Sequence, residues 1–255
     1  MAQYYFVTTL LPTLKIGSPP EIGSYEFDFI LQQNLTGCDL AKVTILRRLT
    51  DIENIRLLLQ DAQLQPNGNF DQKELEDALL NQESLPSYVF EFMENYGDTA
   101  ARLKNFPQLI RKFFKEEIGR QKGFVHDFLL FEWRCRLICS ILRAKALDRP
   151  IEAELALEDS EDPFVAAILE QKDEPSYHPP DEFLPLKTIF ENHKENPHEM
   201  NLALLEWKFS HIDEMAGDHP FSLYRVLGYL IQLDIVERWF SLDKKKGLEF
   251  VEKLA

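Results

Sequence analysis

The sequence predicts an all-α protein, a multi-module helical bundle with pseudo-repeated helical units and at most one short β element near the N-terminus. Through residues 39–147 and 186–254, apolar residues recur every three or four positions, as the buried face of a helix requires. Hydrophobic residues make up 45% of the 255 residues and aromatic residues 12%, so the chain can fill a core. Residues 4–11 are also β-prone, but no comparable run offers a strand with which they could pair.

Residues 4–11 are therefore expected to form either a short extended arm or a first helical turn. A proline and glycine loop follows at residues 19–23, and the helical body is expected to begin with residues 25–33. Pro12 interrupts the apolar start, and no basic segment precedes it. We expect no secretory signal peptide there.

Capping signals divide the next segment into helices. One buried helix face is predicted to continue across this segment. Residues 50–53 have the form of a capping box, which predicts that a new helix starts there. That helix should end at the turn formed by residues 66–68. Residues 71–74 form a second box, whose helix should end near residue 81. The predicted buried face consists of Ile45, Leu49, Ile52, Ile55 and Leu59.

Prolines and glycines mark the helices that follow. Pro86 and Pro107 are each expected at the first position of a helix, where a missing N–H costs nothing. Gly119 and Gly123 precede a long helix over residues 124–147, which Pro150 closes.

Acidic residues and prolines concentrate between residues 151 and 185, with one short helix expected at 164–171. We interpret the remainder as an exposed acidic connection and as the best candidate boundary. The predicted division is 1–150 for the N-terminal helical modules, 151–185 for the connection and 186–255 for a C-terminal module. One continuous domain remains an alternative.

The C-terminal module should contain helices at 186–193 and 199–215 and a longer, mostly apolar one at 220–242. In the last, the polar residues change from one side to the other, so the helix must be covered from two directions or break near Leu233. Its buried face is predicted to comprise Tyr224, Leu227, Ile231, Ile235 and Trp239.

Charge and cysteine content restrict the possible functions. The chain has 43 acidic and 28 basic residues, a formal net charge of −15, which argues against a nucleic-acid partner. The cysteines Cys38, Cys135 and Cys139 form no paired framework, which fits a reducing cytosol, and two thiols one helical turn apart do not make a zinc site; we expect them in the core. Because no window of 18 apolar residues occurs, membrane association would require a partner.

No catalytic pattern emerges from the sequence. It contains no phosphate-binding loop, and its ten glycines are scattered. The spacing of His193, His198 and His211 fits no metal motif, and His126 and Asp127 should point to different sides of a helix. We predict no catalytic, cofactor-binding or metal residues, no cofactor and no enzymatic activity; the partner-binding residues are unknown. Three arginines in an apolar helix could form an anion site, but pairing with acidic neighbours is the commoner role: Arg134, Arg136 and Arg143.

Residues 228–239, GYLIQLDIVERW, resemble the pattern AYLxKLxIxExW in the last helical repeat of the C subunit of bacterial and archaeal V-type ATPases, the counterpart of eukaryotic vacuolar subunit d. They are closer still to a family of shorter, uncharacterised C-like proteins found with bacterial V-type ATPases. A charged turn and a short final helix follow there, and here they correspond to residues 243–246 and 248–254. Gly228 stands where the family often has Ala.

Weaker patches, among them residues 133–145, extend the resemblance. Residues 51–60 are similar, through Asn54, to a repeated family helix DxxNLxxxLRAK, and residues 140–145 resemble its second half. In that second copy Leu137 stands where the family has Asn. The chain is shorter than the full-length family members.

The resemblance implies a cytoplasmic protein, peripheral to the membrane, that is seated on the rotor ring and receives the foot of the central axle. Its work would be mechanical coupling of ion transport to ATP hydrolysis or synthesis, without chemistry of its own. The alternatives are an accessory or assembly factor that is not stoichiometric and, more remotely, a helical enzyme with an unrecognised site. The acidic residues 152–162 are a candidate for the charge that steers basic partner surfaces, or simply a solvated linker.

Overall fold

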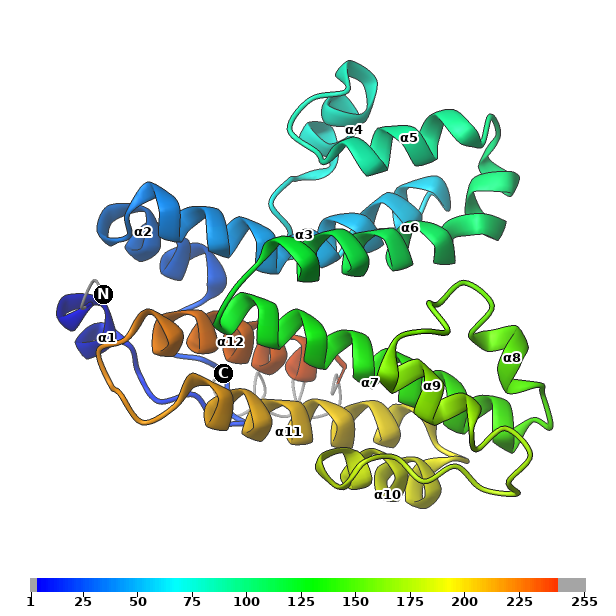
Figure 1. Ribbon diagram of the computed structural model, residues 1–255. Helices are drawn as coiled ribbons and strands as arrows, with labels where there is room; N and C mark the ends of the chain where they lie inside the picture. Colours follow the sequence, from blue (N-terminus) through cyan, green and yellow to red (C-terminus); the bar gives the residue numbers. More distant parts are fainter. Residues whose placement is uncertain (1–3, 243–255) are drawn as a thin grey trace, which may run out of the picture. The chain divides into compact units, whose positions relative to one another are not determined.

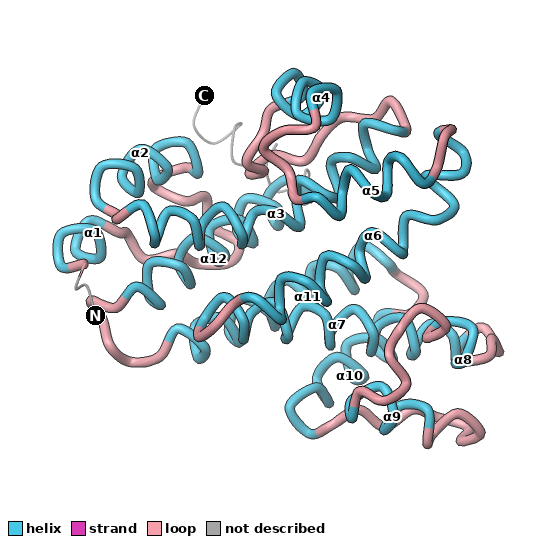
Figure 2. The backbone as a smooth tube through the Cα atoms, turned by 45° about the horizontal axis from the view of Figure 1, so that its top comes forward, coloured by secondary structure: helices cyan, strands magenta, loops and turns pink. Residues whose placement is uncertain are grey.

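The computed structural model describes residues 4–242, and these residues form helices and loops without a strand (Figures 1 and 2). The all-α prediction is confirmed. The β-prone N-terminal run takes the helical alternative, since Tyr5–Leu10 forms α1. The expected final turn and short helix at 243–254 lie outside the described residues. No helix within residues 4–242 is long and apolar enough to cross a membrane.

Backbone contacts group the described residues into two compact units. The first contains residues 4–40, Ile138–Arg143 and residues 176–242, and the second contains Ala41–Leu137 and Ala144–Pro175. The division between Pro175 and Ser176 falls inside the predicted connection 151–185. The division into modules 1–150 and 186–255 stays a prediction. Each of the two units combines segments that are distant in the sequence, so the units do not test a division by chain order.

In the first unit, α12 (Leu223–Leu242) is the central element, and all of residues 226–233 are buried. Helix α11 lies along it, and α1 and α2 also pack against it, so α12 is covered from more than one direction and does not break near Leu233 (Figure 1). The other helices of this unit are α2 (Ser24–Asn34), the 3-10 helix η1 (Asp181–Phe183), α10 (Leu184–His193) and α11 (Pro197–Ala216).

Two contacts show how closely α11 and α12 approach. A Cβ atom on Gly228 would lie 2.8 Å from the Cβ of Ala216, so only glycine fits there without a shift. One turn further, the Gln232 side chain donates to the backbone oxygen of Phe209 over 3.1 Å. Trp239 is only 4% exposed, as predicted, but Tyr224 is 38% exposed. The predicted continuous face is wrong at that end, because the buried residue of the first turn is Leu223 and its neighbour Tyr224 faces solvent.

The second unit contains most of α3 (Gly37–Leu59) and of α7 (Phe124–Ala146) together with α4, α5, α6, α8 and α9. The predicted face of α3 is buried at Ile52 and Ile55 and half-buried at the other three positions. Five helices lie wholly within this unit. The four longer ones are α4 (Gln72–Asn81), α5 (Ser87–Asn95), α6 (Thr99–Arg120) and α9 (Pro163–Leu169), and α8 is the shortest.

Three capping predictions have different outcomes. The box at Asp71 and Glu74 is confirmed, and it begins α4. The box at residues 50–53 is wrong: α3 passes through it unbroken, and the Glu53 carboxylate pairs with Arg56 and Arg136 instead of capping a helix start. The start at Pro107 is also wrong, since α6 begins at Thr99, capped by Asp98, and Pro107 lies inside it.

The acidic segment after α7 is folded onto the second unit. Ile151, in the short helix α8 (Ile151–Glu154), and Leu155 are buried, as are Val165 and Ile168 of α9. The expectation of an exposed connection is therefore wrong for Ile151 and Leu155, whereas Val165 and Ile168 belong to the short helix that was expected at 164–171. Most of its carboxylates do face solvent.

Candidate functional site

The motif residues that carry the resemblance in α3 organise a loop. The Asn54 amide oxygen accepts the backbone N–H of Gln65 over 2.8 Å, and its nitrogen donates to the Gln65 oxygen over 3.0 Å. Asp51 accepts both the backbone and the side-chain N–H of Asn69 over 2.6 Å. A Cβ on Gly68 would lie 2.7 Å from the Asp51 carboxylate. Asp51 and Asn54 thus hold the loop between α3 and α4, and their role is structural.

A buried polar cluster joins three helices of the second unit. Glu117 on α6 is 1% exposed and accepts from the Arg48 guanidinium of α3 over 2.7 Å and from the Tyr88 hydroxyl of α5 over 3.0 Å. Burial, together with the negative charge of Glu117, raises the pKa of the Tyr88 hydroxyl above its ordinary value. These bonds fix the three helices in register.

The candidate histidines do not assemble into a site. His193 Nδ1 lies 3.5 Å from the Glu199 carboxylate. The ring of His211 stacks on Trp207, and burial lowers the pKa of His211. No three metal-ligating side chains cluster within residues 4–242. His126 and Asp127 were predicted to point apart, but His126 Nδ1 lies 2.9 Å from the Asp127 carboxylate. Both side chains are at the surface and bend toward each other.

The arginines and cysteines of α7 behave as core and surface residues. Arg136 pairs with Glu53, the Arg134 guanidinium lies over the Phe164 ring at 5.0 Å, and Arg143 is exposed. Arg136 is accounted for by pairing and Arg134 by stacking, and not by an anion site. Cys135 is buried, as expected, Cys139 is half-buried, and Cys38, for which no position was predicted, is exposed.

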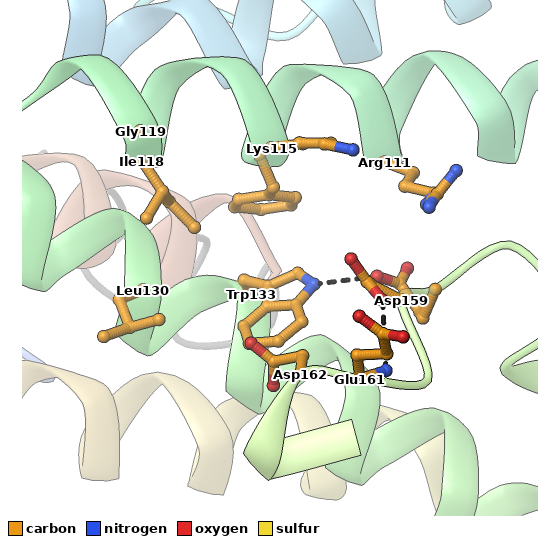
Figure 3. Close-up of a pocket in the computed structure, with 11 residues that line it drawn as sticks. Arg111, Lys115, Ile118, Gly119, Leu130, Trp133, Asp159, Glu161 and Asp162 are labelled. Carbon is orange, nitrogen blue, oxygen red and sulfur yellow. Dashed lines mark hydrogen bonds between the residues drawn. The ribbon is translucent and has the colours of Figure 1, made fainter. Parts of the chain in front are cut away.

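A pocket of about 390 Å³ opens between α6, α7 and the turn that precedes α9 (Figure 3). Arg111 and Lys115 project from α6 on one side, and the Trp133 ring of α7 lies on the other. The acidic turn closes the third side. The lining residues are Arg111, Phe114, Lys115, Ile118, Gly119, Leu130, Trp133, Glu158, Asp159, Glu161 and Asp162.

Glu158 is a half-buried carboxylate of this pocket. Burial raises its pKa above the ordinary value, with Asp162 adding to the effect, while the hydrogen bond from Trp133 and the charge of Arg111 oppose the rise. The Trp133 indole N–H donates to the Glu158 carboxylate over 3.3 Å. Asp162 accepts the N–H groups of Phe164 and Val165 and so caps α9. The acidic turn is therefore held in place on both sides.

The sequence did not reveal this pocket. Its acidic side was identified only as a charged run, and Trp133 only as part of a resembling patch, because the two lie 25 residues apart in the chain. A second hollow of about 380 Å³ shares Arg111 and Lys115 with the first and is lined by α5 residues on its other side. The arrangement offers aromatic surface and opposed charges to a ligand.

A family described as a protein of unknown function, DUF2764, matches residues 1–255. The chain belongs to this family. An uncharacterised protein of Chlamydia muridarum is 30% identical, with 97% of this chain and 96% of the relative covered. Similar proteins of Chlamydia trachomatis and Chlamydia pneumoniae are 28% and 30% identical over 97% and 100% of this chain, and over 96% and 98% of the relatives. No solved structure matches this DUF2764 protein.

Proposed function

We propose that this DUF2764 protein is a non-enzymatic component of a V-type ATPase, equivalent to its C subunit. In this role it lies on the cytoplasmic side, between the membrane rotor ring and the central axle, and couples their movements. The observation that carries the proposal is the resemblance of residues 228–239 to the last helix of that family, which here is α12.

The packing of α12 supports this reading of the resemblance. Gly228, at the position where the family often has Ala, lies at the closest approach of α12 to α11, and Trp239 of the same pattern is buried. The pattern therefore describes an element around which the first unit is built. Close-packed helices resist deformation, which a part that transmits torque between two partners needs.

Binding to isolated axle subunits tests the proposal. Because the chain carries a net charge of −15, we expect association to slow as salt shortens the Debye length below about 8 Å, while dissociation changes less. Absence of binding at every salt concentration would contradict a coupling role. An assembly factor, the second candidate, would bind but would be missing from the mature complex.

A further inference from the structure

The pocket beside Trp133 combines the features that recognise a guanidinium group. A cation is attracted to the face of an indole ring, and a planar guanidinium can stack there while it donates paired hydrogen bonds to a carboxylate. Figure 3 shows the Trp133 ring next to Asp159, Glu161 and Asp162. The cavity, about 390 Å³, lies at the small end of the range in which protein pockets hold ligands.

We propose that this pocket receives an arginine side chain of a partner protein. The partner we assign is an axle subunit of the ATPase, and that assignment rests on the proposed function. The lining has four carboxylates and two cations, so it favours a positive group, in keeping with the acidic chain as a whole. Arginine suits it better than lysine, because only the guanidinium is planar and forked.

Arg111 and Lys115 add a requirement for a negative group on the partner. They lie one helical turn apart on α6 and make no hydrogen bond or ion pair within residues 4–242, although the charge of Arg111 acts on Glu158. A carboxylate close to the arginine on the partner can pair with these two cations. The segment that fits both sides of the pocket therefore carries an arginine and an acidic residue near each other.

The first test is nuclear magnetic resonance of the full chain with N-acetyl-arginine amide as the probe. The three tryptophans, Trp133, Trp207 and Trp239, give three indole N–H signals, and Trp133→Phe assigns one of them. We expect a saturable shift of the Trp133 signal alone, and none with N-acetyl-glutamine amide. No shift, or equal shifts of all three signals, would overturn the proposal.

A matched pair of variants separates the pocket from general charge attraction. Asp159→Asn with Glu161→Gln removes two carboxylates of the lining, whereas Glu152→Gln with Glu154→Gln removes two from the same acidic run outside it. An Asn at position 159 can still accept the N–H of Glu161, as Asp159 does. We expect probe binding to weaken at least tenfold in the first pair and to be unchanged in the second. Equal weakening in both would refute a defined pocket.

The same two variants, with isolated axle subunits as the partner, distinguish this proposal from the proposed function. Axle binding that weakens tenfold only in the pocket variant supports both. Equal binding to the wild type and to both variants overturns the pocket as the docking site and leaves the proposed function standing. If no axle subunit binds even the wild type, the proposed function fails, and the Trp133 signal alone decides whether the pocket takes arginine.

Discussion

Glu237 on α12 caps the N-terminus of helix α2 through Ser24. One carboxylate oxygen of Glu237 accepts the Ser24 backbone N–H over 2.9 Å, and the other accepts the Ser24 hydroxyl over 2.6 Å. The N-cap residue is Gly23, which has no side chain to offer these donors. A residue 213 positions later therefore satisfies the first N–H of the helix, while Glu26 accepts the N–H of Gly23 locally. Glu237 also belongs to the pattern on which the resemblance rests.

Breaking this cap should destabilise the first unit. We expect Glu237→Gln and Ser24→Ala each to lower the free energy of unfolding by about 1–2 kcal/mol, because each removes a hydrogen bond that involves a charged acceptor. Ser241→Ala, a serine in an exposed position of α12, is the control and should change stability by less than about 0.5 kcal/mol. Urea unfolding measures all three; equal values for Ser24→Ala and Ser241→Ala would refute the cap.

Loss of the cationic partner of the buried Glu117 carboxylate in the second unit should destabilise the protein more than loss of the Glu237 cap. Arg48→Met leaves Glu117 buried without its cation, and we expect a loss of about 3–5 kcal/mol in unfolding free energy. Tyr88→Phe removes one neutral donor and should cost about 1–2 kcal/mol. Lys112→Met breaks an exposed pair with Glu91 and should cost less than about 1 kcal/mol. If Arg48→Met costs no more than Lys112→Met, Glu117 does not depend on its cation.

Gly228→Ala tests the contact between α11 and α12. Alanine gains about 1 kcal/mol in helix propensity over glycine, but its Cβ would meet that of Ala216 at 2.8 Å. We expect overpacking to prevail and the substitution to destabilise by about 1–3 kcal/mol. Adding Ala216→Gly should restore much of this loss. A more stable Gly228→Ala protein would show that the helices separate easily.

The titration of Glu158 gives a prediction for pH. Its pKa is raised by burial in the folded protein, so the native state binds this proton more tightly than the unfolded chain does. The stability contributed by the neutral form is present at acid pH and is lost as pH rises through the raised pKa. Between about pH 4 and pH 7, wild-type stability should therefore fall relative to that of Glu158→Gln. Parallel stability curves would contradict the raised pKa, since other carboxylates affect both proteins alike.

The sequence predicted elements whose signals are local and missed those whose partners are distant. Helix α4 was predicted correctly because Asp71 and Glu74 cap each other within four residues. The same logic failed at residues 50–53, since the Glu53 carboxylate pairs with Arg136, 83 residues later in the chain. Pro107 was misplaced because the cap at Asp98 starts α6 earlier, and a helix fixed by packing tolerates an internal proline.

The candidate pocket shows the same limit. Its residues come from α6, α7 and the turn before α9, and no spacing in the sequence indicates that Trp133 lies against Glu158. The polar residues of α12 did predict a helix that is either covered from two directions or broken near Leu233, because residues buried on opposite sides of a helix follow a periodic pattern in the sequence. Local periodicity thus predicts which residues are buried, and chain topology determines which of them meet.

The most direct test of the V-type ATPase assignment is the composition of the purified enzyme. The ATPase is solubilised in detergent from an organism that carries this protein and passed through gel filtration, and the ratio of this chain to the axle subunits is measured across the peak. A coupling role predicts a constant ratio in every fraction and through a second purification step. A ratio that declines or varies across the peak, or a complex that hydrolyses ATP and transports ions without this chain, would contradict the assignment.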